Sequence, residues 1–397
     1  MKKITITLLA IFGWCLNTVS AADLYVRDLG AGGAYATVSD AITAASNGDR
    51  IIIRPKSGGI PYVENLVVAK NLTFVSEINF SKYIIQGNIQ ITPLAGRIVT
   101  FHNLSATGNV GTTVASPTGG RTFVNIFNSL IAGSATFDNT NVSVTISGST
   151  FGSTLSLVHG IVTGNDISSG FIYVNSDATT DLATAPVYII ANKARGISLS
   201  STTYAFNVLN NFFYTASSSP VSVSSIKPGS VNLIQNNTIA ISSAVTNNVI
   251  NFTASIAQTG FVSVLNNVLN SSGAAYKIYN PSSTTVTVYA YYNISSSSMA
   301  NLFGVTSANN SGNANITVST TNGNTTGENV NGGSPEEEYQ DINLTRNDIG
   351  NTGGSNAWTN YWSTTTPNKA QVYFLNTPRR IYTGGTNFTV EGGAFTK

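Results

Sequence analysis

Five segments, VYIIAN (187–192), AFNVLNN (205–211), VNLIQNN (231–237), VSVLNN (262–267) and VTVYAYYN (286–293), repeat one pattern: a short apolar run that ends in asparagine. The asparagine pairs recur 26 and 30 residues apart, and the flanking steps are 19 and 26 residues. A period of roughly 20 to 50 residues indicates a repeat protein, in which each unit buries its apolar face against its neighbours. Because the unit contains strands and turns without helical spacing, the pattern predicts the coils of a parallel β-helix.

Asparagine suits a corner between two sheets for two reasons. It tolerates the left-handed backbone conformation of a sharp turn. Identical amides stacked about 4.8 Å apart can also donate and accept hydrogen bonds along the stack. The repeat therefore predicts a structural ladder whose members are Asn192, Asn211, Asn237, Asn267 and Asn293.

Residues 1–21 are expected to be a bacterial-type signal peptide. Lys2 and Lys3 precede an apolar run from Ile4 to Leu16, and the small residues of Val19-Ser20-Ala21 fit a cleavage site. The run is too short for a membrane-spanning helix. Cleavage after Ala21 would remove the only cysteine. We therefore expect a protein that is secreted or held at the cell surface, with no membrane span in its mature form.

Charge is sparse and balanced. Without Lys2 and Lys3, 17 of the 19 basic residues remain, equal to the 17 acidic residues. Nucleic acids and anionic membranes require clustered basic residues, so neither is an expected partner. The expected partners are the protein itself, through lateral or end-to-end contacts, or an extracellular polysaccharide.

The N-terminal sequence carries a family resemblance. The stretch YATVSDAITAASNGDRIIIRPKSGGIPYVENLVVAKNLTFVSE (35–77) contains a short amphipathic helix, a Gly-Asp pair before a strand, and a Tyr-x-Glu before the next. This order resembles the opening of secreted right-handed parallel β-helix proteins of the pectin-lyase-like superfamily. The resemblance implies an all-β, right-handed solenoid with a helix that caps its first coil. It leaves the activity open, because that superfamily contains lyases, hydrolases, adhesins and inactive structural members.

Catalytic residues are scarce where the coils are most regular. From Leu182 to Gly327 there is no Asp or Glu, and only four basic residues occur: Lys193, Arg195, Lys227 and Lys277. Hydrolysis of a glycoside needs two carboxylates, and a calcium-assisted lyase needs several around its metal. No catalytic residue, cofactor or metal is therefore expected in this stretch.

A polysaccharide lyase or glycoside hydrolase stays open as the alternative. In metal-assisted β-helix lyases a Lys and an Arg serve as base and acid, and Asn192-Lys193-Ala194-Arg195 is faintly similar to that arrangement. Under this alternative calcium is the cofactor. The candidate residues, which would have to converge on one face, are Asp138, His159, Asp166, Lys193 and Arg195.

The C-terminal sequence is aromatic. Trp358, Tyr361 and Trp362 form either a platform on which sugar rings stack or an apolar cap over the last coil. The expected organisation is a signal peptide (1–21), an N-terminal cap with the first coils (22–77), β-helix coils (78–294), Ser/Thr/Asn/Gly-rich loops or irregular coils (295–345) and a C-terminal aromatic and β cap (346–397). The expected function is a non-catalytic surface, adhesive or fibre-forming protein that contacts glycans.

Overall fold

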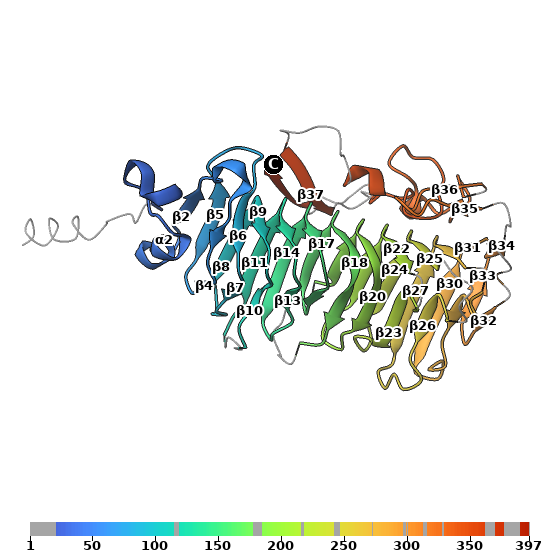
Figure 1. Cartoon of the computed structure of the whole chain (residues 1–397). Helices are drawn as coiled ribbons and strands as arrows, with labels where there is room; N and C mark the ends of the chain where they lie inside the picture. The colour runs from blue at the N-terminus through green and yellow to red at the C-terminus, as the bar shows by residue number, and fades with distance from the viewer. Residues whose placement is uncertain are drawn as a thin grey trace, which may run out of the picture.

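Most coils of the chain contain three short strands, and the coils stack into a long solenoid (Figure 1). The structure is a computed structural model. It describes residues 21–114, 119–177, 185–215, 218–241, 247–271, 273–296, 299, 301–312, 316–327, 329–361, 370–376 and 390–396. The expected signal peptide and Trp362 lie outside the described residues.

The first strand of every coil belongs to a 13-stranded parallel sheet, here called sheet A. Its strands in spatial order are β1 (Asp23–Val26), β2 (Arg50–Ile53), β5 (Leu72–Ser76), β8 (Ile98–His102), β11 (Thr122–Phe127), β14 (Val142–Ser147), β17 (Gly160–Thr163), β19 (Val187–Ile190), β21 (Phe206–Leu209), β24 (Val231–Gln235), β27 (Gly260–Leu265), β30 (Val286–Tyr291) and β33 (Thr306–Ala308).

The other two strands of each coil form two parallel rows of a 21-stranded sheet, sheet B. The first row contains β3 (Tyr62–Val63), β6 (Tyr83–Gln86), β9 (Leu104–Ala106), β12 (Leu130–Ile131), β15 (Thr150–Phe151), β18 (Asp166–Asn175), β20 (Lys193–Ser200), β22 (Phe212–Thr215), β25 (Thr238–Ile241), β28 (Val268–Asn270), β31 (Ile294–Ser295) and β34 (Ser311–Gly312). The second row contains β4 (Leu66–Val68), β7 (Ile89–Ile91), β10 (Val110–Thr112), β13 (Ala135–Phe137), β16 (Leu155–Leu157), β23 (Val221–Ser225), β26 (Ile250–Phe252), β29 (Ile278–Tyr279) and β32 (Leu302–Phe303), and β18 and β20 are long enough to belong to both rows. The parallel β-helix expected from the sequence is confirmed.

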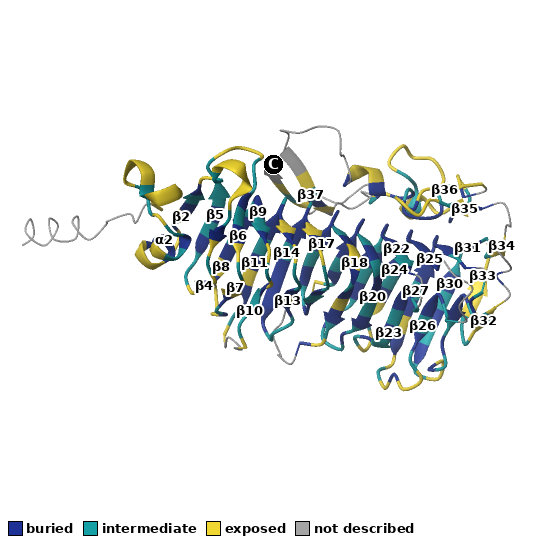
Figure 2. Ribbon diagram, viewed as in Figure 1, coloured by how far each residue is buried: buried dark blue, intermediate teal, exposed yellow. Residues whose placement is uncertain are grey.

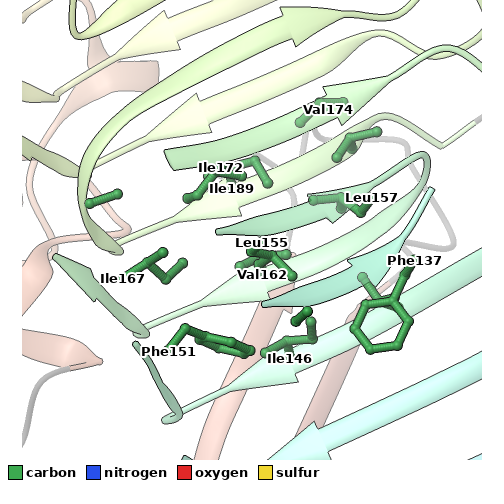
Figure 3. Packing of buried hydrophobic residues seen from close by; sticks show 14 of the residues in the cluster. Phe137, Ile146, Phe151, Leu155, Leu157, Val162, Ile167, Ile172, Val174 and Ile189 are labelled. Atoms are coloured by element: carbon green, nitrogen blue, oxygen red, sulfur yellow. The ribbon is translucent and has the colours of Figure 1, made fainter. Parts of the chain in front are cut away.

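The core lies inside the coils, because side chains along each strand alternate between the interior and the outer face. Phe151, Leu155, Val162, Ile172 and Ile189 come from both sheets and point into this interior (Figure 3). The buried stripe continues through successive strands along the solenoid (Figure 2). The coils end at Gly312 in β34, beyond the expected boundary at residue 294.

A short helix, α2 (Val38–Ala44), covers the first coil, as the sequence predicted. Thr37 is its N-cap, and the carboxylate of Glu64 accepts hydrogen bonds from the backbone N–H groups of Val38 (2.9 Å) and Ser39 (2.8 Å). The glutamate of the Tyr-x-Glu motif therefore fixes the capping helix, since it supplies acceptors for helical N–H groups that have no partner within the helix. Two short 3₁₀ turns, η1 (Asp28–Gly33) and η2 (Ser57–Gly59), complete this end.

The asparagine ladder is present at the corner between sheet A and the first row of sheet B. The Nδ2 of each member donates to the Oδ1 of the member in the next coil, at 3.0 Å from Asn192 to Asn211 and from Asn237 to Asn267. The ladder also contains Asn165 and Asn310, which the sequence analysis did not include. The left-handed conformation belongs to the residue before each ladder asparagine: Asn210, Asn236 and Asn266 have φ of 55°, 53° and 57°. The two properties expected of one asparagine are thus divided between the two residues of each pair.

After the last coil the chain turns back along the outside of this corner, which corrects the expectation of a cap over the last coil. We call residues 316–361 the strap; it contains β35 (Thr317–Val318), β36 (Thr325–Thr326), η3 (Glu337–Tyr339) and η4 (Trp358–Asn360). The left-handed asparagines hold it: the Nδ2 of Asn210 donates to the carbonyl of Asn351 at 3.1 Å, and the Nδ2 of Asn236 donates to that of Asp348 at 2.8 Å.

The chain ends in an antiparallel hairpin of β37 (Ala370–Asn376) and β38 (Glu391–Thr396), which lies beside the middle of the solenoid (Figure 1). Tyr373 packs against Phe127, with ring centroids 5.2 Å apart, and Phe374 packs against Tyr188, at 5.1 Å. The hairpin therefore covers part of the outer face of sheet A. No helix in the described ranges is long and apolar enough to cross a membrane.

Candidate ligand-binding site

Three of the charged candidates lie on the outer face of sheet B, on the two strands that span both rows. Asp166 and Lys193 begin β18 and β20 and are direct cross-strand neighbours. Arg195 lies two residues further along β20, so its side chain points to the same face as that of Lys193. All three side chains are half-buried. The register between the strands shifts between Ile167 and Phe171, which bends the sheet beside Arg195.

Two aromatic side chains share this face. The rings of Phe171 and Tyr173 have centroids 6.3 Å apart, and the guanidinium carbon of Arg195 lies 5.7 Å from the centroid of Phe171. This distance is within the range of a cation–π contact. Tyr173 is 37% exposed and can therefore meet a ligand. We call Asp166, Phe171, Tyr173, Lys193 and Arg195 the β18–β20 site.

Glycine allows this arrangement at one position on β20. A Cβ on Gly196 would lie 2.5 Å from the ring of Phe171 and 2.3 Å from the carbonyl oxygen of Pro220. The ring therefore lies across the backbone of the neighbouring coil, where any other residue would displace it. Neither aromatic residue was predicted from the sequence, although the alternation in GFIYV (170–174) places Phe171 and Tyr173 on one face.

The site carries a net positive charge on a run of coils with few other charged side chains. Of the other two basic residues between Leu182 and Gly327, Lys277 is 2% exposed, and its Nζ donates to the carbonyl of Ser271. Burial lowers the pKa of Lys277 from its ordinary value. Lys227 is half-buried just after β23, on a neighbouring coil. Lys193 and Arg195 therefore supply the positive charge of the outer face of β20.

Asp138 and His159 lie at the other end of β18. The carboxylate of Asp138 accepts hydrogen bonds from Ser156 Oγ (2.9 Å) and from Asn175 Nδ2 (3.3 Å). Asn175 and Asp166 are the last and first residues of β18, a ten-residue strand, so Asp138 and Asp166 lie by opposite ends of a strand with about 30 Å of backbone, at about 3.3 Å per residue. The structure therefore divides the proposed catalytic residues into two groups, and they do not converge on one face.

His159 belongs to a buried polar cluster at the corner that leads into sheet A. Its Nδ1 lies 2.9 Å from Ser143 Oγ, and its ring centroid lies 4.6 Å from that of Tyr204. The hydroxyl of Tyr204 contacts both Arg121 and Asp177, whose nearest charged atoms are 3.9 Å apart. Arg121, Asp177 and Tyr204 are 0–8% exposed. This cluster links successive coils and exposes almost no surface to a ligand. Its members are too far apart in the sequence for a motif to predict it.

The C-terminal aromatic residues do not form an exposed platform. Trp358 and Tyr361 are 5% and 8% exposed, and they pack with Ile190, Ala191 and Phe212 on the side of the coils. Burial raises the pKa of Tyr361 to about 12. The expected sugar-stacking role is therefore wrong for Trp358 and Tyr361. The alternative, an apolar contact with the coils, is present, but these side chains pack on the side of the coils and not over the last coil.

The described part of the chain contains no group of three or more His, Cys, Asp or Glu side chains arranged to hold a metal ion. Comparison with known protein families, with curated proteins and with solved structures found no match to this chain.

Proposed function

We propose that the protein is an extracellular β-helix surface protein that binds acidic glycans at the β18–β20 site without cleaving them. The observation that carries this proposal is the presence of two cationic side chains and an exposed tyrosine on one face of β18 and β20. Guanidinium and ammonium groups bind the carboxylates of uronic acids. The exposed ring of Tyr173 stacks against the apolar face of one sugar of the bound chain, and Asp166, seven residues earlier in β18, accepts hydrogen bonds from the hydroxyl groups of another.

Binding without turnover follows from the separation of the charged groups. A glycoside hydrolase places its two carboxyl groups about 5 to 10 Å apart across the scissile bond. Asp138 and Asp166 are at opposite ends of β18. Asp166 also lies directly opposite Lys193, and its Oδ1 accepts a hydrogen bond from the backbone N–H of Ser168 at 3.0 Å. This placement favours a recognition role for the pair.

The test is calorimetric titration of the purified protein with polygalacturonate. We expect Arg195→Ala and Tyr173→Ala each to lower the affinity about tenfold, which corresponds to about 1.4 kcal/mol. Lys227→Ala, a cation on a neighbouring coil outside the site, should leave the affinity unchanged. Equal affinity in all variants would disprove the site.

The ultraviolet absorbance of unsaturated products and the release of reducing ends should be followed in the same samples, with and without calcium. Product that disappears in Lys193→Ala or Arg195→Ala would replace the binding role with a calcium-dependent lyase. Reducing ends without unsaturated product would indicate a hydrolase instead. The proposal expects neither signal.

A second candidate function is self-association, and the two ends of sheet A favour it. The N-terminal coil is covered by α2 and carries ion pairs, Asp23 with Arg50 and Arg27 with Glu77. The last strand, β33, consists of three exposed small residues. An uncharged edge strand is able to pair with the edge of another chain. Analytical ultracentrifugation should show dimers that are lost in Ala308→Lys and kept in Ala36→Lys; a monomeric protein at all concentrations would reject this candidate.

A further inference from the structure

A second exposed aromatic surface lies on sheet A, several coils beyond the hairpin. Phe261 on β27 and Tyr289 on β30 are stacked, with centroids 6.1 Å apart and planes at 15°, and Tyr289 is followed by Tyr291 at 6.1 Å and 26°. Val231 on β24 is the direct cross-strand neighbour of Phe261. Phe261 is 43% and Val231 58% exposed. We call Val231, Phe261, Tyr289 and Tyr291 the sheet A platform.

The hairpin shows that aromatic side chains on this face of sheet A pack against other rings. The register places Tyr188 and Tyr289 in one row along sheet A, through the partners Asn207, Leu233 and Ser263. It likewise places Phe127 and Tyr291 in the next row, through Ser147, Thr163, Ile190, Leu209, Gln235 and Leu265. Tyr188 and Phe127 are covered by the rings of Phe374 and Tyr373. The platform repeats these two aromatic positions without a covering ring from the described residues.

The chemistry around the platform selects an uncharged ligand. No acidic residue occurs anywhere between Leu182 and Gly327. The direct cross-strand neighbours of Phe261 and Tyr289 include neutral hydrogen-bonding groups, those of Thr287, Ser263 and Thr306. Two of the three rings are tyrosines, whose hydroxyls keep a polar end beside an apolar face. A sugar ring offers the same combination of an apolar face and a hydroxyl-bearing edge.

We propose that the sheet A platform binds neutral polysaccharides, with consecutive sugar rings stacked on Phe261, Tyr289 and Tyr291. The site is separate from the β18–β20 site, because it lies on the other sheet and on later coils. A protein with both sites would hold an acidic polysaccharide on one face and a neutral polysaccharide on another. Where the two polysaccharides occur together, binding of one would raise the effective concentration of the other at its own site.

The experiment uses affinity electrophoresis of the full chain in gels that contain hydroxyethylcellulose, xylan or mannan. At least one of the three should retard the wild-type protein. We expect Phe261→Ala and Tyr289→Ala each to weaken that retardation about tenfold, because each substitution removes one of the rings on which a sugar stacks. Phe123→Ala is the matched control, because Phe123 is 41% exposed on the same face of sheet A but lies on β11. Phe261→Trp keeps a flat ring and should keep binding.

The outcomes separate this inference from the proposed function. The platform variants should bind polygalacturonate as the wild type does, and Arg195→Ala should bind the neutral glycan as the wild type does. Absence of retardation by all three neutral polysaccharides, or equal loss in Phe261→Ala and Phe123→Ala, would overturn the inference. Loss of monomer–dimer exchange in Phe261→Ala, measured by ultracentrifugation, would assign the surface to a second copy of the chain and would also overturn it.

Discussion

The same corner of the solenoid is built in two ways. In the later coils, from Asn165 to Asn310, each amide between these two ends of the ladder donates to the next amide, accepts from the preceding one and donates to a backbone carbonyl of the preceding coil. In the two coils before them serines take this place, at Ser129 and Ser149. Ser149 Oγ accepts from the backbone N–H of Ser129 at 3.0 Å and donates to the carbonyl of Ser147 in its own coil at 3.1 Å.

The difference lies in the reach of the side chain. Both halves supply a hydrogen-bond acceptor for the backbone N–H at the corner, because a buried N–H group needs a partner. Only asparagine also has a donor that reaches the neighbouring side chain, so only the later half has a continuous chain of side-chain hydrogen bonds between coils. The left-handed asparagines that bind the strap, Asn210, Asn236 and Asn266, also belong to this later half.

The largest effect is expected from Asn237→Ala, in the middle of the asparagine half. The Oδ1 of Asn237 accepts from the backbone N–H and the Nδ2 of Asn211, and its own Nδ2 donates to Val208 O and to Asn267 Oδ1. The substitution leaves four buried polar atoms without these partners and should lower the free energy of unfolding by about 3–4 kcal/mol. Urea unfolding measures it, with Asn207→Ala on the outer face of β21 as the control. A loss below that of the control would contradict the ladder's role.

The second effect comes from Asn236→Ala, the left-handed partner in the same pair. It removes the contacts of its Nδ2 with Asn347 Oδ1 (2.9 Å) and with the carbonyls of the strap. It also places alanine at a φ of 53°, which costs about 1–2 kcal/mol. We expect a total loss of about 2–3 kcal/mol.

Asn236→Gly separates the two causes, because glycine accepts positive φ but makes no side-chain contact. It should be less destabilising than Asn236→Ala by the backbone component alone. Limited proteolysis should cut the strap faster in both variants. If both variants kept the strap as protected as in the wild type, the strap would be held by its apolar contacts and not by the asparagines.

The third effect is expected from Ser149→Ala in the serine half, at about 1–2 kcal/mol. This substitution removes the acceptor of the Ser129 N–H and one donor to its own coil, and no neighbouring side-chain amide loses a partner. Under the same urea titration it should cost less than Asn237→Ala. Equal losses would show that the hydrogen bonds between side-chain amides add no stability beyond that of the hydrogen bond to the backbone N–H.

The sequence predicted the repeating part of this molecule because periodicity records local geometry. The apolar alternation gave the strands, and five ladder asparagines followed from their place after each run. The two further members escaped because Asn165 follows Gly164 and Asn310 follows Asn309 in serine-rich sequence, outside the five apolar runs. The strap could not be predicted, since its contacts join residues more than 100 positions apart, such as Asn236 and Asn347. The same reason hid the β18–β20 site, where Phe171 and Arg195 meet only through the register of two coils.

The smallest effect depends on pH and concerns His102 in the earlier coils, beside one of the two aromatic contacts of the hairpin. His102 on β8 stacks on Phe127, the residue that Tyr373 covers, with ring centroids 5.1 Å apart. Burial lowers the pKa of His102 below its ordinary value of 6.5. The unfolded chain therefore binds this proton more readily than the folded chain, so stability is complete above pH 6.5, falls as the pH drops below it, and levels off beneath the folded-state pKa.

The asparagine half contains no histidine and almost no acidic residue, so a fall in stability between pH 7 and 5 should be confined to the other half. Hydrogen exchange, corrected for the intrinsic rate, should show weaker protection of β8 and β37 at pH 5 than at pH 7, with β24 and β27 unchanged. His102→Gln should remove this pH dependence. A uniform loss of protection along the solenoid would show instead that the two halves unfold as one unit, so that the difference between their corners has no consequence for local stability.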